Sequence, residues 1–393
     1  MKKSLEVLRN YLKDEEKKVG KKVLIVCGQE IVKERNDGGK LCSYRNFQLF
    51  QQTFGKENVY LIMFSKYRDI DENPNIIRLP YHKNSINKAL NIIQGHMFTS
   101  ASVENKVLDF VEKQGIDFVV FERSMFGSLV SKLKKKSNCK VGVFIHNIEK
   151  QYFKNKLLHR GPVYLLPYLC VKHSESTMLK KTDYIMTLTE RDSRLLREEY
   201  GVSGNIVLPM SFQDRYDDTR SIQKKDGKNL LFIGTMFPPN YDGVKWFVEH
   251  VMTELKEYDL QIVGKNFEQK RKELERDNVQ VIGTVDDLSE YYYSDSAMIM
   301  PIFYGDGMKI KTAESMMYGR IIFAADEALE GYEADGVDGI YRCNTREEFI
   351  ENIRNYFKNK KDVCFSQEVR ALFIREYSFE KQVEYCKKEW NLQ

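Results

Sequence analysis

A chain of 393 residues with a net charge of +5 is too long for a single domain and too weakly basic for wholesale nucleic-acid binding. Its residues are 42% hydrophobic and 30% charged, which is the composition of a globular protein with a substantial core. We therefore expect two or three domains and no nucleic-acid partner, although local basic patches fit the charge.

Seven cysteines are scattered along the chain without a Cys-x-x-Cys pair. This odd, widely spaced set favours free thiols in a reducing compartment over disulfides or a zinc site. The N-terminal stretch is too charged for a secretion signal, and no apolar run reaches the roughly 20 residues that cross a bilayer. We expect a cytoplasmic protein.

The chain opens with an amphipathic pattern at residues 1–18, where Leu5, Leu8 and Leu12 fall on one side. This pattern predicts a short helix that either covers the first domain or docks a partner. Short apolar runs then alternate with helical segments, which is typical of a parallel sheet covered on both faces. The first six runs span 22–27, 60–64, 117–122, 140–146, 184–189 and 205–210.

A second series of buried strands follows a polar stretch at 211–228, which is the best linker candidate. Its runs span 230–235, 260–264, 279–284, 297–302 and 320–325. The sequence therefore predicts two Rossmann-like α/β domains in tandem, at 1–209 and 210–375, followed by a last helix in 376–393 that packs back on the first domain.

Ligands of open parallel sheets bind outside the carboxyl ends of the strands, so the site is expected in a cleft between two facing domains. After the first strand, Gly38 and Gly39 let backbone N–H groups approach a phosphate or sugar, although a glycine pair also suits an ordinary turn. His146 ends a strand and could bind a sugar hydroxyl or stabilise charge near a reacting anomeric carbon. A satisfied core or surface histidine is the alternative.

The second domain has a similar loop at Gly234 and Thr235, where backbone amides could face an anion or simply form a tight turn before Pro238. The most unusual segment is 301–320, because charged residues stand between a buried strand and a buried helix. Its candidate site residues are Gly305, Asp306, Gly307, Met308, Lys309, Lys311 and Glu314.

Each residue type in this segment suits a nucleotide diphosphate. The glycines allow a sharp turn that exposes amides, and the lysines supply cations for the diphosphate. The carboxylate of Glu314 could accept hydrogen bonds from two ribose hydroxyls. A salt bridge from Glu314 to a local lysine is the alternative.

The motif P-x(3)-G-x-G-x-K-x-K-x(2)-E-x(4)-G-R in this segment closely resembles the donor site of retaining glycosyltransferases of the GT-B fold, family 4 type. "FIGTMFPPNYDGVKWF" is similar to the first strand and loop of the family's C-terminal domain. "FIHNIE" and residues 174–201 resemble the end of its N-terminal domain. "YSFEKQVEYCKKEW" resembles the helix that crosses back to that domain.

The resemblance implies sugar transfer from a nucleotide diphosphate sugar, with retention and without a metal or other cofactor. Helix N-termini and lysines would neutralise the leaving group. By the family's pattern, Glu314 would bind the ribose and Lys309 or Lys311 the diphosphate. The remaining implied contacts are the donor sugar at Asp306, Gly307 and Met308, the base at the backbone of Val285, the sugar and acceptor at His146, and the reacting centre at Gly38 and Gly39.

Two features depart from the family pattern. One is Asp306, which is shorter than the glutamate that many members carry at this place, and this bears on its contact with the donor sugar. In the other, Thr235 and Met236 follow Gly234 where many members carry Arg and Lys, so more of the phosphate binding falls to Lys309 and Lys311. An Asp-Ile-Asp triplet at 69–71 is similar to the metal motif of the other glycosyltransferase fold, but it lies in a polar loop and suggests coincidence.

Other functions remain open from the sequence. A non-catalytic partner subunit of the same fold, a nucleotide-sugar epimerase and a dinucleotide-dependent oxidoreductase are the alternatives, and the missing G-x-G-x-x-G disfavours the last. The acceptor would be a glycan, glycolipid or protein. Residues 151–173 mix aromatic, leucine and basic residues, which fits either a solvated helix or contact with an anionic membrane. The base, sugar, acceptor and oligomeric state are not encoded in any motif.

Overall fold

The computed structural model describes residues 20–33, 38–67, 70–80, 99–224, 227–305, 307–359 and 362–389. The contacts divide the chain into two compact units, Met1–Met210 with Gln382–Gln393 and Ser211–Lys381. We call them the N-terminal unit and the C-terminal unit. The expected helix at 1–18 and the site candidate Asp306 lie outside the described residues.

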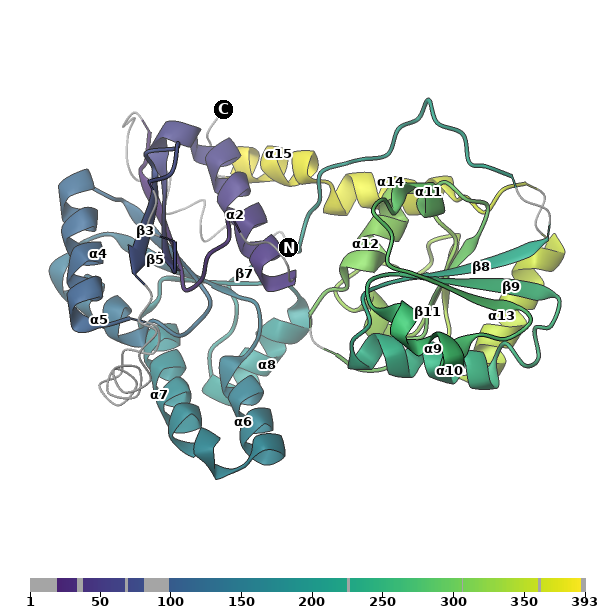
Figure 1. Cartoon of the computed structure of the whole chain (residues 1–393). Helices are drawn as coiled ribbons and strands as arrows, with labels where there is room; N and C mark the ends of the chain where they lie inside the picture. Colours follow the sequence, from purple (N-terminus) through teal and green to yellow (C-terminus); the bar gives the residue numbers. More distant parts are fainter. Residues whose placement is uncertain are drawn as a thin grey trace. The chain divides into compact units, whose positions relative to one another are not determined.

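The N-terminal unit is built on a seven-stranded sheet in the order β3-β2-β1-β4-β5-β6-β7 (Figure 1). All neighbouring strands pair in parallel, so their carboxyl ends share one edge. The strands are β1 (Val23–Cys27), β2 (Val59–Ser65), β3 (Ile76–Pro80), β4 (Phe118–Glu122), β5 (Lys140–Ile145), β6 (Tyr184–Thr187) and β7 (Ile206–Val207). The central strands are nearly inaccessible to solvent, as their continuous apolar runs predict.

Six described helices accompany this sheet. They are α2 (Gly38–Phe54), α4 (Ala101–Gln114), α5 (Gly127–Lys136), α6 (Glu149–Arg160), α7 (Leu165–Lys181) and α8 (Glu190–Tyr200). Local signals set their ends: Ser100 accepts a hydrogen bond from the N–H of Val103 at the start of α4, and Gly115 ends that helix in the left-handed conformation.

The C-terminal unit has a six-stranded sheet in the order β10-β9-β8-β11-β12-β13, also with parallel pairing. Its strands are β8 (Lys228–Ile233), β9 (Tyr258–Val263), β10 (Val279–Gly283), β11 (Ala297–Met300), β12 (Ile322–Ala324) and β13 (Ile340–Arg342). Its helices are α9 (Pro238–His250), α10 (Arg271–Leu274), α11 (Ser289–Tyr292), α12 (Ile310–Met317), α13 (Arg346–Asn359), α14 (Gln367–Leu372) and the π-helical turn Phe373–Tyr377.

In both sheets the strand order reverses next to the first strand, between β1 and β4 and between β8 and β11. Ligands of doubly wound α/β sheets bind at this reversal, beyond the carboxyl ends of the strands. The two Rossmann-like folds predicted from the sequence are confirmed, and the loops after these four strands are the places to look for a site.

Several boundaries differ from the sequence-based expectation. Gly38 and Gly39, expected in a loop or turn after the first strand, form the first turn of helix α2. Helix α9 begins at Pro238, because proline is well suited to the first turn of a helix. Strands β3 and β13 were not expected. Residues 151–173 form two helices, α6 and α7, separated by Gly161 and a short 3-10 turn, Pro162–Tyr164.

The last helix, α15 (Phe379–Glu389), passes from one unit to the other in its first turn. Gln382 is buried in the N-terminal unit, where its Nε2 donates to the carbonyl of Pro209 at 2.6 Å and its Oε1 accepts from Nη1 of Arg45 at 3.3 Å. No helix among the described residues combines the length and apolar character that a membrane span requires.

Candidate functional site

In the C-terminal unit, Lys311 reaches back from α12 to the loop that follows β8. Its Nζ donates to Oδ1 of Asn240 at 2.5 Å and lies 4.4 Å from the ring centroid of Phe232. A Cβ atom on Gly234 would lie only 2.7 Å from this Nζ, so glycine is required for the approach. Asn240 is buried and donates to the carbonyl of Thr235 at 2.7 Å. The structure therefore brings the predicted residues Gly234, Thr235 and Lys311 together around Asn240.

Among the described residues, no carboxylate pairs with the ammonium group of Lys311. Burial, followed by repulsion from Lys309, lowers the pKa of Lys311 to about 7. A cation in such a place becomes more stable when an anion binds next to it. Lys311 is thus well placed to hold a phosphate beyond the end of β8.

Lys309 is engaged differently. Its Nζ donates to the carbonyl of Gly307 at 2.7 Å and pairs with Oε1 of Glu327 at 2.6 Å, and its side chain is 12% exposed. Gly305 and Gly307 have φ values of 145° and 64°, which favour glycine. Because Glu327 already neutralises Lys309, Lys311 is the stronger of the two phosphate candidates.

Glu314 lies in the second turn of α12 with both carboxylate oxygens occupied. Nη2 of Arg215 donates to Oε1 at 2.6 Å, and the hydroxyl of Tyr292 donates to Oε2 at 3.2 Å. The alternative of a local lysine as the partner is wrong, since the cation is Arg215. That arginine side chain is 60% exposed, so ribose hydroxyls could displace it.

The remaining site candidates of this unit do not form one hydrogen-bonded cluster among the described residues. Thr235 is exposed, Met308 is buried and Val285 is half-buried in the loop after β10. Within the described part of the unit, no hydrogen bond links Val285 to Lys311 or Glu314. Its predicted contact with the base stays a prediction, as does the role of Asp306.

In the N-terminal unit, His146 follows β5 and pairs with the last residue of β4. Its Nε2 lies 2.6 Å from Oε2 of Glu122, and Nδ2 of Asn46 on α2 donates to the other carboxylate oxygen at 3.0 Å. Burial alone would lower the pKa of His146, but its interactions with Cys42 and Glu122 raise it to about 10. His146 is therefore a positively charged imidazolium at neutral pH, suited to stabilising negative charge.

A second ionisable pair lies beside this histidine. Arg123 follows β4 with φ at 81°, an uncommon conformation for a bulky side chain, and its Nη1 lies 3.9 Å from Oε1 of Glu149. Burial raises the pKa of Glu149 to about 7, with Arg123 opposing the shift. Such strain and perturbed ionisation are common at functional sites.

Helix α6 begins against a buried carboxylate. Glu175 of α7 accepts hydrogen bonds at 3.0 Å from the N–H groups of Glu149 and Lys150, and a third from the Ser124 hydroxyl. The carboxylate therefore satisfies the otherwise unpaired amides of the first turn of α6. Gly38 and Gly39 lie at the start of α2, and no described contact joins them to His146.

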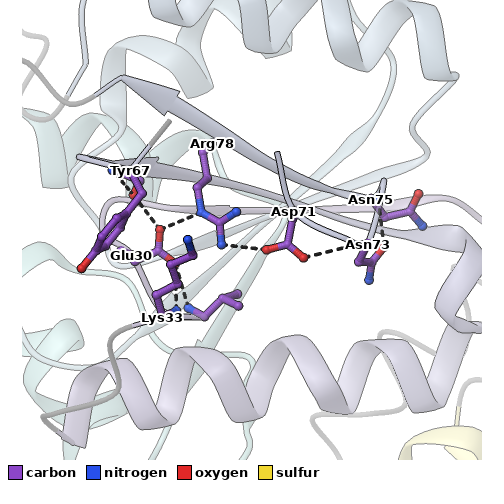
Figure 2. Close-up of polar contacts among 9 residues, drawn as sticks. Glu30, Lys33, Tyr67, Asp71, Asn73, Asn75 and Arg78 are labelled. Atoms are coloured by element: carbon purple, nitrogen blue, oxygen red, sulfur yellow. Dashed lines mark hydrogen bonds and ion pairs between the residues drawn. The ribbon is translucent and has the colours of Figure 1, made fainter. Parts of the chain in front are cut away.

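A third polar cluster lies where β1 and β2 end and along β3 (Figure 2). Glu30 accepts hydrogen bonds from Ser65 at 2.6 Å and Arg78 Nε at 3.0 Å, and Arg78 Nη2 donates to Asp71 at 2.7 Å. Burial raises the pKa of Glu30, but these hydrogen bonds and the N–H of Lys33 outweigh it, and the pKa falls below its usual value. Asp71 of the Asp-Ile-Asp triplet is thus an ion-pair partner. No cluster of potential metal ligands occurs among the described residues.

Sequence reasoning missed the side chains that hold the predicted ones in place. They are Glu122 for His146, Asn240 for Lys311, Glu327 for Lys309, and Arg215 with Tyr292 for Glu314. An acidic residue closing the apolar run "DFVVFE" and an asparagine after two prolines were visible signals. The other partners carried no local signal, because they come from distant parts of the chain.

Residues 227–359 match the family model described as Glycosyl transferases group 1. A search of curated proteins returned no match. Solved structures similar to this chain include a sucrose-phosphate synthase from Thermosynechococcus elongatus, at 12% identity and a TM-score of 0.67, covering 95% of this chain and 99% of that one. A glycosyltransferase from Rickettsia africae aligns at 14% identity and a TM-score of 0.66, covering 95% and 98%.

HepE of Anabaena, solved with UDP and glucose, aligns at 9% identity and a TM-score of 0.61, covering 94% of this chain and 99% of that one. Sequence identities this low show only that the fold is shared. The structural alignments extend over nearly the whole length of both chains in each pair. Residues 227–359 thus match the glycosyl transferases group 1 family, and the chain as a whole has the GT-B fold of these solved structures.

Proposed function

We propose that this protein is a retaining, metal-independent glycosyltransferase that uses a nucleotide diphosphate sugar. The observation that carries this proposal is Lys311, whose Nζ is held against Gly234 at the strand reversal of the C-terminal unit. The similar protein HepE has been solved with UDP-glucose, which is a donor of this class.

In this proposal Lys311 holds the diphosphate, with amides around Gly305 and Gly307 as further donors. Glu314 takes the ribose hydroxyls by exchanging its contact with Arg215, and Asp306 faces the donor sugar. His146 of the N-terminal unit, whose pKa is raised to about 10, is proposed to supply the positive charge that stabilises the leaving oxygen. Transfer then occurs on one face of the sugar without a protein nucleophile.

The acceptor is proposed to be a glycan, glycolipid or protein in cell-surface polysaccharide or glycoconjugate synthesis at the cytoplasmic side. WaaG, another similar structure, is a glycosyltransferase involved in lipopolysaccharide biosynthesis; it aligns at 15% identity and a TM-score of 0.56, covering 94% of this chain and 95% of that one. A non-catalytic partner subunit or a nucleotide-sugar epimerase of the same fold remains the competing function.

Calorimetry with UDP, GDP, dTDP and CMP, with and without EDTA, tests the donor site. One nucleotide should bind at micromolar strength, unaffected by EDTA. Lys311→Ala and Glu314→Ala should each lower transfer at least about tenfold, or about 1.4 kcal/mol. Lys245→Ala, which removes an exposed lysine of α9, is the matched control.

The outcome also separates the competing functions. A protein that binds none of the four nucleotides would be a non-catalytic partner. Conversion of the donor sugar in the absence of any acceptor would identify an epimerase, and inversion at the anomeric carbon of the product would contradict the retaining mechanism.

A further inference from the structure

Helices α6 and α7 run side by side and are joined by a short turn (Figure 1). We call residues 152–173 of this pair the hairpin surface. Of the twelve residues of α6, only Glu149 at its start is buried. In α7 the buried residues begin at Val171, so its first six residues are all at least partly exposed. Two consecutive helical segments thus lack a buried face.

Apolar side chains are unusually exposed on this surface. The chain has twelve exposed large apolar side chains among its described residues, and six of them lie here. They are Leu158 at 70%, Val163 at 75%, Leu169 at 50%, Tyr152 and Leu165 at 48%, and Leu166 at 46% exposure. Contiguous apolar exposure of this kind marks an interaction surface rather than ordinary scatter.

The charged side chains of the same segment are all basic. No Asp or Glu occurs from residue 150 to residue 174, whereas the chain as a whole has 57 acidic residues. Lys154, Arg160 and Lys172 are exposed among the apolar side chains, and the Nζ of Lys156 lies 4.3 Å from the ring centroid of Tyr152. The hairpin surface is therefore both apolar and basic.

A shallow hollow adjoins the surface between α7 and α8. Lys172, His173 and Lys180 line it from α7. Tyr200 and Glu199, whose carboxylate pairs with Lys150, line it from α8. Basic side chains beside an exposed leucine row can hold the phosphate of a lipid headgroup while the leucines contact its acyl chains.

We propose that the hairpin surface docks onto an anionic lipid bilayer. Leucine and valine side chains enter the headgroup boundary, and the basic side chains contact headgroup phosphates. A second copy of the chain is disfavoured as the occupant, because two surfaces without an acidic residue repel each other. The inference deepens the proposed function by bringing the enzyme to a lipid-linked acceptor, but its test does not depend on transferase activity.

Flotation with vesicles tests the proposal. The full chain should float with vesicles of phosphatidylglycerol and phosphatidylcholine in equal parts at low salt, and not with pure phosphatidylcholine. Leu158→Ser combined with Val163→Ser should weaken binding at least about tenfold, since each replaces an apolar side chain that enters the boundary. Ile70→Ser, which changes a 97% exposed apolar residue elsewhere in the same unit, should bind like the unaltered protein.

A charge-reversal pair tests the electrostatic part. Lys154→Glu with Arg160→Glu should weaken binding at least about tenfold and reduce its salt dependence. Lys135→Glu with Lys136→Glu, at exposed positions at the end of α5, is the matched control. No flotation with anionic vesicles, or flotation of the Leu158 and Val163 double variant like the unaltered protein, would overturn the proposal. So would a dimer that this variant dissociates in the absence of any vesicle binding.

A spectroscopic readout covers the case in which the double variant fails to fold. Val163→Trp keeps an apolar side chain at the turn between the two helices, and its emission should shift to the blue with anionic vesicles only. An unshifted emission in the presence of bound vesicles would show that another surface makes the contact.

Discussion

Lys311 and His146 are two buried cations with opposite shifts in pKa, and the difference lies in their neighbours. Among the described residues the ammonium of Lys311 contacts the amide oxygen of Asn240 and the ring of Phe232, and burial, followed by repulsion from Lys309, lowers its pKa to about 7. Burial also disfavours the imidazolium of His146, but its interactions with Cys42 and with the carboxylate of Glu122 at 2.6 Å outweigh burial and raise its pKa to about 10. One side chain becomes charged when an anion arrives, whereas the other is charged already.

Nucleotide binding should therefore depend on pH through Lys311. Below its pKa of about 7 the lysine is already protonated, and above that value it must take up a proton when a diphosphate binds. We expect affinity to fall above pH 7 by at most about tenfold per pH unit. Calorimetry of the unaltered protein and Lys311→Met across this range measures the effect, and an equal pH dependence in both proteins would contradict it.

The His146–Glu122 pair makes a prediction for stability. Because its pKa is raised from 6.5 to about 10 in the folded protein, the pair stabilises fully below pH 6.5 and progressively less as pH rises to about 10. Glu122→Gln should lower the free energy of unfolding by about 3 kcal/mol at pH values just below 6.5. It should also reduce the loss of stability between pH 6.5 and about 10. Denaturant unfolding at several pH values measures both effects, and Glu190→Gln, at an exposed position on α8, is the control.

For single residues, the sequence predicted which side chains belong to the candidate site but not which side chains contact them. His146 and Lys311 stood out because charged groups at the ends of buried strands and at the starts of buried helices are rare. The partners Glu122 and Asn240 become visible only once β4 is placed beside β5 and α9 beside α12. No spacing along the chain encodes those pairings.

At the scale of elements, close backbone approach positions the donor-site loops. A Cβ atom on Gly243 of α9 would lie 1.8 Å from the carbonyl oxygen of Pro301 after β11. A Cβ on Gly264 would lie 2.0 Å from the carbonyl oxygen of Gly234. These two glycines let α9 and the loop after β9 pack directly onto the segments that carry the candidate site.

Gly243→Ala should accordingly move α9 away from β11. We expect the C-terminal unit to lose about 3 kcal/mol of stability, as overpacked sites do, and nucleotide affinity to fall because α9 carries Asn240. Gly336→Ala, at a left-handed position with open space around it, should cost only about 1 kcal/mol and leave affinity unchanged. Thermal unfolding and calorimetry on both variants make the comparison, and equal losses would refute the packing argument.

The central strands were predictable, and one edge strand of each sheet was not. Strands such as β1 and β11 are continuous apolar runs because both faces are covered. Strand β3, "IIRLP", is half-exposed at the edge of its sheet and contains Arg78, and β13 has only three residues. A short or half-exposed edge strand gives no such run, so the sequence missed one edge strand of each sheet, whereas the opposite edges β7 and β10 were predicted.

For the whole molecule, the main feature is that the N-terminal unit is completed by residues from the other end of the chain. Gln382 of α15 contacts Arg45 and Pro209, and Cys386 is buried in the same unit. The C-terminal unit is the intervening segment Ser211–Lys381. Stability of the first unit is therefore linked to a segment that the chain reaches last.

Gln382→Ala should lower the stability of the N-terminal unit by about 1–3 kcal/mol, because it removes the partner of Nη1 of the buried Arg45 and one of the two donors to the Pro209 carbonyl. The C-terminal unit should unfold as before and keep its stabilisation by nucleotide. Calorimetric unfolding with and without nucleotide resolves the two effects, with Gln367→Ala at an exposed position of α14 as the control. A loss confined to the nucleotide-stabilised transition would contradict this assignment.

The same feature has a consequence during synthesis on the ribosome. The first unit to emerge cannot close around Gln382 until the 171 residues from Ser211 to Lys381 have been translated. At typical elongation rates this takes roughly 10–30 s. Throughout that interval Nη1 of Arg45 lacks the Gln382 oxygen and the Pro209 carbonyl lacks one of its two donors, so chaperones have longest access to the part of the protein that was made first.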